Sequence, residues 1–563
     1  MTTIKNFDPI HIEILKNRLE GISDGMALTV MKSSRSSIVR TALDFSTGIL
    51  NQDGELIGQG LCLPIHLGGM MPALESCLER YEDQVRPGDI FITNDPYEGG
   101  SHLPDIFLFK PVFHSNILVA YVCAMSHHTD IGGRVAGGNA CDSTEIYQEG
   151  LRIPPLKLFS ERKPNETLFR IIEKAVRVPE VVAGDLMGQI AGLDYGELEY
   201  QKLTEDIGAI KVQESTRSLL SYTESMTRQA IEKLPNGEWT YTDYVDDDGF
   251  VDQPIPITVT VNKSHDEIHV DFRGTGPQCL GAIQPLFQTT KGMVYAATKT
   301  ALGCLGFDIP NTAGYFRPVT ITAPIGSFVN PQIPAPVAAR NLGCIRIFQT
   351  MMGAFQQILP EHLSACSGGA EVSITLAGYH KGKSPWKPWV LVDGWLEVAS
   401  GAYPNRDGFE GQHCFSSNLA NTPAETIEVE IPVMVDEVSL LPDSEGAGEY
   451  RGGLGMRKTY KYLQNDTLVT LRSDRMKFSP KGTHGGQSSS NTTVTINHNQ
   501  EDKENMPSKF LRYMKAGETL QIDVPGGGGW GDPFKRHKTL VRQDVIEEKI
   551  SAKRAQSVYG SSH

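Results

Sequence analysis

Apolar residues near the start of the chain recur at the spacing of a helix face. Leu15, Leu19 and Ile22 follow one another at intervals of three and four residues, and this pattern predicts a helix over residues 8–34. The same spacing returns later in the chain. It predicts further helices over residues 67–86, 166–177, 182–231, 289–305 and 346–359.

Runs of alternating or mostly apolar residues predict strands between and after these helices. Two early runs, over residues 37–50 and 55–60, are joined by Asn51-Gln52-Asp53-Gly54, a sequence typical of a hairpin turn. After residue 237 strands become the dominant element. The other predicted strands cover residues 90–92, 118–125, 239–245, 257–261, 268–272, 319–323, 372–376, 389–392, 426–435, 457–463, 467–472 and 492–496.

The order of the elements predicts a mixed α+β fold of several layers, with a helix-rich N-terminal part followed by strand-rich regions. We expect an N-terminal region over residues 1–235, a middle α/β region over 236–365 and a strand-rich C-terminal region over 366–533. Residues 534–563 carry many lysines and arginines, so we expect this basic tail to be solvated or partly disordered.

Composition and charge argue against several classes of protein. The 563 residues include 52 Lys and Arg against 67 Asp and Glu, a formal net charge of −15, which argues against binding to nucleic acid. No apolar run is long enough to span a membrane, and residues 1–15 lack the pattern of a signal peptide, so we expect a cytoplasmic protein. The nine cysteines include no Cys-x-x-Cys pair, which argues against a disulfide framework or a thiolate zinc site.

Glycine is unusually frequent. The chain has 56 glycines, about a tenth of its residues, whereas the average is about 7%. Glycine permits tight turns and close backbone approach. Many of these residues lie between Asn94 and Pro155, beside histidines and aspartates, and others lie over Gly526–Gly529.

Two copies of His-x-x-Asp form the strongest chemical signal. His102 and Asp105 make the first pair, and His127 and Asp130 make the second. Imidazole and carboxylate without sulfur are typical ligands of divalent Mn, Fe or Zn. Pro104 favours a loop for the first pair, and the second pair follows a predicted strand. The alternative is that these residues only cap turns and bind water.

The chain carries no convincing nucleotide-binding motif. Around Gly378 and Gly382 the spacing is one residue too short for a P-loop. The glycines at 526, 528 and 531 match Gly-x-Gly-x-x-Gly, but Asp532-Pro533 argues against the helix that this motif needs. Gly21–Gly25 matches Gly-x-Ser-x-Gly inside a predicted helix, so a serine hydrolase is also not indicated.

Seven segments distributed along the chain carry recognisable motifs. They are Asn94–Asp105, His127–Gly133, Tyr147–Pro155, Asp271–Gln278, Ile309–Pro318, Arg451–Gly455 and Pro525–Pro533. In this order they resemble the B-type subunit of ATP-dependent hydantoinases, and the resemblance runs from about residue 7 to residue 533. That family includes the corresponding region of oxoprolinases, a caprolactamase subunit, and the related subunits of acetone and acetophenone carboxylases.

The resemblance implies a division of labour between two subunits. A separate A-type subunit, with an actin-like ATPase fold, would bind ATP and phosphorylate the substrate. The B-type subunit would hold a divalent metal, Zn, Mn or Fe, and complete the reaction. The metal ligands implied by the matching motifs are Asp44, His102, Asp105 and His127. His127 is chosen over His128 because of the family's spacing before Ile-Gly-Gly.

The resemblance also suggests roles for four residues near the metal. Asp130 would lie behind the ligands and orient an imidazole. Glu149 and Arg152 would line the pocket or form a structural salt bridge. His66 would be structural or would carry a proton.

The leading functional interpretation is the metal-bearing subunit of an ATP-dependent cyclic-amide hydrolase, acting on a hydantoin, a lactam or oxoproline. The alternative is a subunit of an ATP-dependent ketone carboxylase of the acetone or acetophenone type. A third interpretation is a noncatalytic scaffold for the A-type partner. In each case we expect a hetero-oligomer, without nucleic acid or membrane as a partner.

Overall fold

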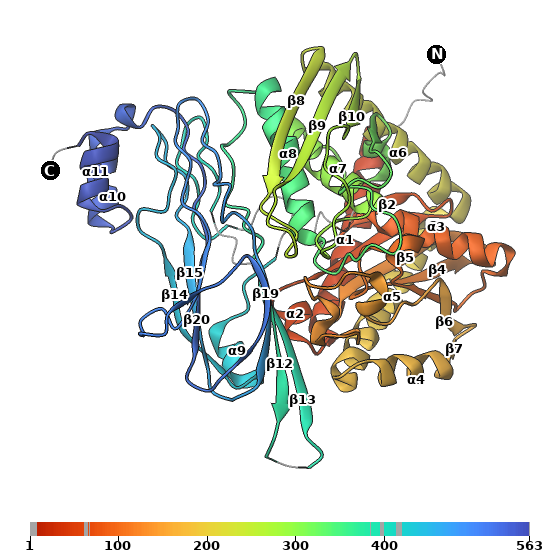
Figure 1. Ribbon diagram of the computed structural model, residues 1–563. Helices are drawn as coiled ribbons and strands as arrows, with labels where there is room; N and C mark the ends of the chain where they lie inside the picture. Colours follow the sequence, from red (N-terminus) through yellow and green to blue (C-terminus); the bar gives the residue numbers. More distant parts are fainter. Residues whose placement is uncertain are drawn as a thin grey trace.

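In the computed structural model, the helix-rich N-terminal part and the strand-rich C-terminal part lie on opposite sides of the molecule, and helices and strands of the middle part lie between them (Figure 1). The structure describes residues 8–60, 66, 68–382, 384–394, 399–412 and 419–561. Among these residues, no helix combines the length and the apolar character that crossing a membrane requires.

The N-terminal part is a seven-stranded sheet covered by long helices. Its strands are β1 (Phe45–Asn51), β2 (Leu56–Gln59), β3 (Ile90–Thr93), β4 (Asp105–His114), β5 (Ile117–His127), β6 (Leu156–Ser160) and β7 (Lys163–Pro164). Its helices are α1 (Pro9–Ser33), α2 (Ser37–Arg40), α3 (Met70–Tyr81), α4 (Glu166–Ala175), α5 (Pro179–Ile207) and α6 (Ala209–Glu232). The strand order is β2-β1-β5-β4-β3-β6-β7.

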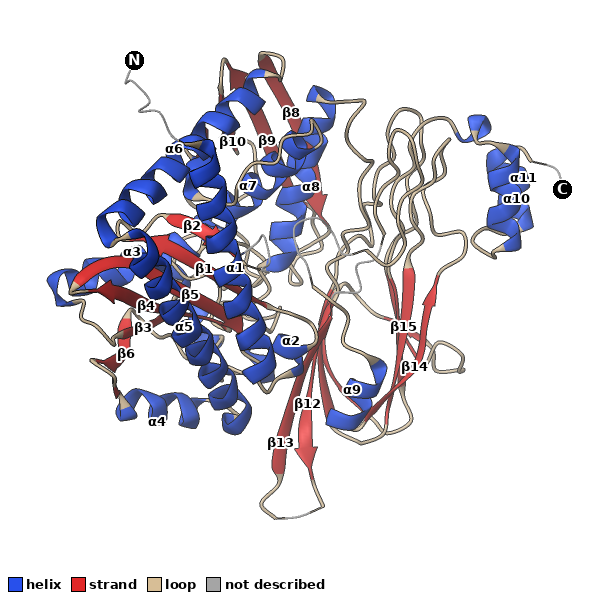
Figure 2. Ribbon diagram, turned by 180° about the vertical axis from the view of Figure 1, so that it is seen from behind, coloured by secondary structure: helices blue, strands red, loops and turns tan. Residues whose placement is uncertain are grey.

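Helix α1 shows how the local sequence sets this arrangement. The carboxylate of Asp8 accepts a hydrogen bond of 3.0 Å from the N–H of Ile10, which starts the helix. Leu15 and Leu19 are buried, so the predicted apolar face is confirmed. Helix α1 packs along α5, and α5 also covers β4 and β5 (Figure 2).

Two predictions in the N-terminal part were wrong in detail, and one strand was missed. The predicted strand over 37–50 begins as the short helix α2, capped by Ser36, and becomes strand only at Phe45. The predicted helix over 182–231 is two helices, because Gly208 adopts a φ of 93° between α5 and α6. Strand β4 was not predicted, since its apolar run lies in a stretch that has the composition of loops.

The middle part packs one sheet against two helices. Its strands are β8 (Gly237–Val245), β9 (Ile255–Ser264), β10 (Glu267–Asp271) and β11 (Val319–Thr322), and its helices are α7 (Phe287–Gly303) and α8 (Asn341–Ile358). The order is β11-β10-β9-β8, and α8 lies against α7, β8 and β9. The predicted helices and strands of this part are confirmed to within a few residues.

The C-terminal part holds two further sheets. Its elements are β12 (Ser373–His380), β13 (Lys387–Gly394), α9 (Ala424–Glu430), β14 (Val433–Leu440), β15 (Met456–Tyr462), β16 (Thr467–Arg472), β17 (Thr493–Ile496), β18 (Glu504–Asn505), β19 (Lys509–Met514) and β20 (Thr519–Asp523). The sheet orders are β13-β12-β16-β19 and β14-β15-β20-β17-β18. Buried residues of both sheets, such as Ile374, Leu471 and Leu520, form one apolar core.

The predicted strand over 426–435 was wrong in its first half. Helix α9 occupies that half, after Pro423 and with Glu425 in its first turn, which are both signals of a helix start. Only Ile427 of the helix is buried, and Val429 is 87% exposed. The alternation of Ile427 and Val429 therefore does not reflect a half-buried strand.

The basic tail is folded, contrary to the prediction of a solvated or partly disordered segment. It forms α10 (Lys538–Ile546) and α11 (Ala552–Tyr559), whose residues Val541 and Tyr559 are buried against Ala447. The guanidinium of Arg536 pairs with Asp407 at 2.6 Å and with Asp544 at 2.7 Å. The positive charge of Arg536 is thus neutralised by two acids. One of them, Asp407, is distant in sequence, so a count of the charges within the tail does not reveal it.

The glycines of Arg451–Gly455 and Pro525–Pro533, here called the C-terminal glycine motif, pack backbone against backbone. A Cβ atom added to Gly452 would lie 1.9 Å from the carbonyl oxygen of Gly527, and one added to Gly527 would lie 2.0 Å from that of Ser400. No side chain fits such spaces, so these glycines allow several extended segments to pack directly on one another. The described glycines of this motif therefore serve packing within the C-terminal part.

Candidate metal centre

The candidate ligands meet at one end of the N-terminal sheet. Asp105 is the first residue of β4 and His127 is the last residue of β5, and the antiparallel register pairs them directly. A turn before β4 brings back His102, whose carbonyl oxygen accepts from the N–H of Asp105 at 3.0 Å. Ligand atoms of His102, Asp105 and His127 all lie within 4.8 Å of one another, and all three residues are buried.

The hydrogen bonds of His102 leave its second nitrogen facing a carboxylate. Nδ1 lies 2.8 Å from the carbonyl oxygen of Ala338, which can only accept, so Nδ1 carries the proton. Nε2 then presents a lone pair 3.1 Å from Oδ1 of Asp105. Burial and the nearby Arg340 lower the pKa of His102, so a second ring proton is disfavoured. A metal cation between these two electron-rich atoms would resolve the contact.

His127 is left without partners. Both of its ring nitrogens are buried and neither has a hydrogen-bond partner in the described structure. Burial lowers the pKa of His127 well below its ordinary value, so the ring is neutral. A buried polar atom without a partner costs about 1–3 kcal/mol. A bound metal would satisfy one of these nitrogens.

Asp105 is held as a carboxylate. Its Oδ2 accepts hydrogen bonds from Ser101 and from the guanidinium of Arg340. Although burial opposes ionisation, the guanidinium of Arg340 keeps the pKa of Asp105 well below its ordinary value. Oδ1 remains directed at His102, which is the arrangement that a metal ligand needs.

Asp44 and His66 lie beside this group. The carbonyl oxygen of Asp44 accepts from the N–H of His127 at 3.0 Å, but its carboxylate lies outside the cluster of three and faces Nε2 of His66 at 3.8 Å. Burial and the charge of Asp105 raise the pKa of Asp44 well above its ordinary value. His66 is held by Ser46 at 2.8 Å, and burial lowers its pKa to about 3, which makes it a poor proton carrier.

Asp130 closes a loop instead of orienting an imidazole. Its carboxylate accepts from the N–H of Gly137 at 2.8 Å and from both the backbone and the guanidinium of Arg177. These bonds tie the segment after β5 to the residues before α5. The contact with a histidine that the sequence suggested is not among them.

Glu149 supports His102 through the backbone. Its Oε1 accepts from the N–H groups of Val337 and Ala338 at 2.8 Å and 2.9 Å. Ala338 is the residue whose carbonyl fixes the tautomer of His102. Burial raises the pKa of Glu149 well above its ordinary value. Among the described residues Glu149 forms no salt bridge and does not belong to the group of three ligands, and it holds the backbone segment that orients His102.

Arg152 has the structural role that was one of its two predicted roles. Its guanidinium donates two hydrogen bonds to Asp95, the shorter at 2.7 Å, and lies 5.4 Å from the ring centroid of Tyr147. Asp95 also caps the turn that follows it by accepting from the N–H of Tyr97 at 3.0 Å. Arg152 therefore fixes the loop that precedes His102.

Several polar residues near the centre were not identified from the sequence. Arg340 and Asn341 start α8, Glu371 precedes β12, and Arg472 ends β16. All four are buried. The one sequence signal for Arg340 is a charge directly after the apolar run Val337-Ala338-Ala339. For Glu371 and Arg472 the local sequence carries no such signal, because they reach the centre only through the packing of the C-terminal part.

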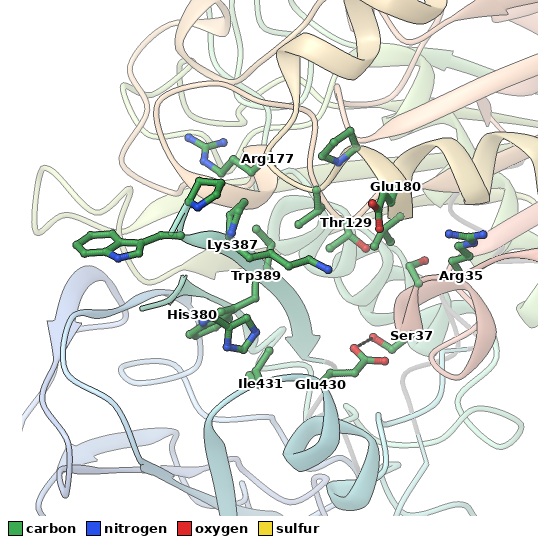
Figure 3. Close-up of a pocket in the computed structure, with 18 residues that line it drawn as sticks. Arg35, Ser37, Thr129, Arg177, Glu180, His380, Lys387, Trp389, Glu430 and Ile431 are labelled. Atoms are coloured by element: carbon green, nitrogen blue, oxygen red, sulfur yellow. Dashed lines mark hydrogen bonds between the residues drawn. The ribbon is translucent and has the colours of Figure 1, made fainter. Parts of the chain in front are cut away.

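A cavity of about 790 Å³ borders the loop that follows β5 (Figure 3). Its walls come from Thr129 in that loop, from the start of α5 and from the β12–β13 hairpin. Arg177 lines it, and on the opposite side Ser37 donates a hydrogen bond of 3.0 Å to Glu430. None of the three candidate ligands lines this cavity. It is therefore distinct from the space between the ligand atoms.

Comparisons with known proteins place the chain in a family. The family model of hydantoinase B/oxoprolinase matches residues 8–533. The B-type subunit of a putative D-/L-hydantoinase from Pseudomonas sp. (strain NS671) is 30% identical over 99% of this chain and 96% of that protein.

Two solved structures share the fold. The ATP-dependent caprolactamase from Pseudomonas jessenii superposes with a TM-score of 0.92 at 29% identity, over 99% of this chain and 96% of that chain. An acetone carboxylase structure gives a TM-score of 0.89 over 98% of this chain and 79% of that chain, but at 16% identity it shows a common fold alone. The match of the family model over most of the sequence settles the assignment: the chain belongs to the hydantoinase B/oxoprolinase family.

Proposed function

We propose that this chain is the metal-bearing subunit of an ATP-dependent cyclic-amide hydrolase that acts on a hydantoin, a lactam or oxoproline. The observation that carries the proposal is the buried group of His102, Asp105 and His127, in which a lone pair faces a carboxylate and an imidazole has no partner. Perturbed buried groups of this kind are typical of functional sites.

An A-type ATPase subunit would supply the phosphoryl group. The sequence has no P-loop, and its relatives include a B-type hydantoinase subunit and an ATP-dependent caprolactamase. Activation is needed because an amide carbonyl is stabilised by resonance and its nitrogen is a poor leaving group. Phosphorylation of the carbonyl oxygen makes the carbon a better electrophile.

The chemistry assigned to this subunit is hydrolysis of the activated amide. Addition of water forms a tetrahedral carbon, and the ring C–N bond breaks as a proton passes to nitrogen. A second water releases inorganic phosphate from the resulting acyl phosphate. When bound, a divalent metal supplies Lewis acidity for the first of these steps.

The residues of the chain have separate tasks in this proposal. His102, Asp105 and His127 hold the metal, and Asp44 is proposed as a fourth ligand because its backbone is bonded to His127. His66 lies beside Asp44, with its Nε2 3.8 Å from the carboxylate. Because these groups are buried, bulk water is excluded and their electrostatic interactions are strengthened.

The alternative is a subunit of a ketone carboxylase, because the chain shares its fold with an acetone carboxylase. It differs from the hydrolase in a simple requirement. A carboxylase consumes bicarbonate and places its carbon in the product, whereas a hydrolase needs only water.

The test is an assay of the chain purified together with its A-type partner. ATP is supplied with a panel of hydantoins, lactams, oxoproline and ketones, with and without labelled bicarbonate. We expect ATP-dependent ring opening that does not require bicarbonate. Label in the product would establish the carboxylase instead. Ring opening at the wild-type rate by a metal-free His102→Ala variant would refute the role of the metal centre.

A further inference from the structure

A connected set of buried polar side chains lies beside the candidate metal centre. The guanidinium of Arg472 donates to Oδ1 of Asn139 at 2.6 Å and lies 3.5 Å from Oε1 of Glu371. The amide of Asn341 donates to the same oxygen of Glu371 at 2.7 Å. Each of these residues is at most 5% exposed. They come from the loop after β5, from α8 and from the same end of the neighbouring strands β12 and β16, so three parts of the chain build this set.

The set is continuous with the metal centre through two arginines. Arg340 precedes Asn341 in the chain and donates to Asp105. Asn341 donates to Oε1 of Glu371, and Arg472 faces that same oxygen. Contacts and one peptide link therefore lead from the candidate ligand Asp105 to Arg472.

Three donors in this neighbourhood have no acceptor. Nδ2 of Asn139, Nε of Arg340 and Nε of Arg472 are buried, and no hydrogen-bond partner is present in the described structure. The orientation of Asn139 is fixed, because an arginine only donates and so the amide oxygen must face Arg472. Leaving each donor unpaired costs about 1–3 kcal/mol.

The two guanidinium groups also carry like charges in a buried place. Burial lowers the pKa of Arg472, and the positive charge of Arg340 lowers it further, whereas Glu371 opposes this effect. Like charges in a low dielectric repel. An anion between or beside them would relieve the repulsion and accept from the free donors.

We propose that Asn139, Arg340 and Arg472 form an oxyanion subsite that binds the phosphoryl group of the activated substrate beside the metal centre. This inference rests on the proposed function for the origin of the phosphoryl group. A phosphoryl group offers three oxygens to the three free donors, and a carboxylate offers two. Both are oxyanions, so the test includes a probe of each kind.

The test is isothermal titration calorimetry of the purified, Mn²⁺-loaded full chain with inorganic phosphate and with acetate. The decisive variant is Asn139→Asp, which retains an oxygen acceptor for Arg472 and replaces the free Nδ2 donor by a negative oxygen. We expect phosphate to bind wild type more tightly than acetate does. The variant should bind phosphate at least roughly tenfold more weakly, because it loses a charge-assisted hydrogen bond.

The matched control is Asn499→Asp, which adds the same charge at an exposed asparagine and should bind phosphate as wild type does. If Asn139→Asp does not fold, Arg472→Lys replaces it, since lysine keeps the charge and loses the planar fork of donors. Equal phosphate affinity in the tested variant and wild type would overturn the subsite. Tighter binding of acetate than of phosphate would overturn the phosphoryl assignment.

The calorimetric result is independent of the proposed function. Binding of phosphate to the chain alone requires neither ATP, nor the partner, nor a ring substrate. A subsite sensitive to Asn139→Asp in a chain that opens no ring would leave the oxyanion site intact and refute the hydrolase. Ring opening by the wild type, together with equal phosphate affinity in Asn139→Asp and wild type, would support the hydrolase and refute the oxyanion subsite.

Discussion

Two buried clusters of charged residues in this protein differ in whether they are complete, that is, in whether each side chain has at least one polar partner within the described structure. In the first, at the junction of the middle and C-terminal parts, Arg346 and Arg475 both pair with Asp243, at 3.3 Å and 2.9 Å, and Arg346 also pairs with Asp474. In the second, the candidate metal centre, His127 has no partner in the described structure and Nε2 of His102 faces a carboxylate.

The difference separates a structural network from a binding site. Taking charges out of water is costly, and paired opposite charges offset that cost within the protein. The network around Arg346 supplies its own counter-charges, so it holds two parts of the chain together. In the centre, the whole ring of His127 has no partner in the described structure, whereas in the network around Arg346 only single atoms, Nε of Arg346 and Nε of Arg475, lack one. Burial and charge alone therefore do not identify a functional site, and a side chain without any partner is the better guide.

The largest expected effect is the loss of metal from the incomplete cluster. His127→Ala removes a proposed ligand, so we expect no stoichiometric metal and a loss of ring opening of at least about 100-fold, since even residues behind the ligands contribute 10–100-fold. Elemental analysis and the ATP-dependent assay measure the two quantities.

His128→Ala is the matched control for that experiment. His128 is the adjacent histidine, but its Nε2 lies 3.0 Å from Oε1 of Gln189 and so it has a partner within the protein. We expect this variant to retain metal. Stoichiometric metal in His127→Ala would contradict the ligand assignment.

Breaking the complete cluster should affect stability and not metal. Arg346→Met leaves Asp243 and Asp474 buried with less counter-charge, and the expected loss in the free energy of unfolding is about 3–5 kcal/mol. Urea denaturation measures it. Arg273→Met, at an arginine whose side chain is 85% exposed, should change stability by no more than about 0.5 kcal/mol. Loss of metal in folded Arg346→Met would erase the distinction between the clusters.

Glu149 tests how the incomplete cluster is positioned. Glu149→Ala removes the acceptor of the Val337 and Ala338 N–H groups, which frees the peptide that orients His102. We expect metal affinity to fall about 10–100-fold. Glu149→Gln keeps an acceptor oxygen and should restore most of the affinity. A drop in stability with unchanged metal affinity in Glu149→Ala would show a purely structural role.

The smallest expected effect is a pH dependence of the complete cluster. Burial and the charge of Asp246 raise the pKa of Asp474 to about 7, from an ordinary value of 3.8. The folded state therefore binds a proton that the unfolded state has released, and this contribution to stability is lost as pH rises through 7. Between about pH 6 and about pH 8 the loss is about 1–2 kcal/mol.

Urea denaturation across this range, compared with Asp474→Asn, measures that pH dependence. The asparagine variant cannot titrate at this position, so its stability should change less with pH. A wild type whose stability changes with pH no more than that of the variant would show that Asp474 is ionised in the folded state throughout.

Local sequence was a good guide where an element depends on its own residues. The helix at Leu15 and Leu19, the hairpin at Asn51–Gly54 and strand β16 all follow from short-range periodicity or turn chemistry. It failed where tertiary contacts decide. The basic tail folds because Asp407, far away in sequence, neutralises Arg536.

The candidate site shows the same division. The histidines and aspartates stood out because of their spacing, and the family resemblance selected among them. Arg340 and Arg472 did not stand out, because a single arginine carries no periodicity. The structure also removed one suggested role, since Asp130 binds Gly137 and Arg177 and so closes a loop.

The order of amino acids was enough to assign the α+β class, the family and the two His-x-x-Asp pairs. Which atoms converge depended on tertiary packing. The register of β4 and β5 sets His127 opposite Asp105, and packing of the middle and C-terminal parts sets Arg340 against Asp105 and Arg472 against Asn139. The physical reason is that periodicity records which face of an element is buried, whereas the neighbour of a buried polar atom is set by contacts between segments hundreds of residues apart.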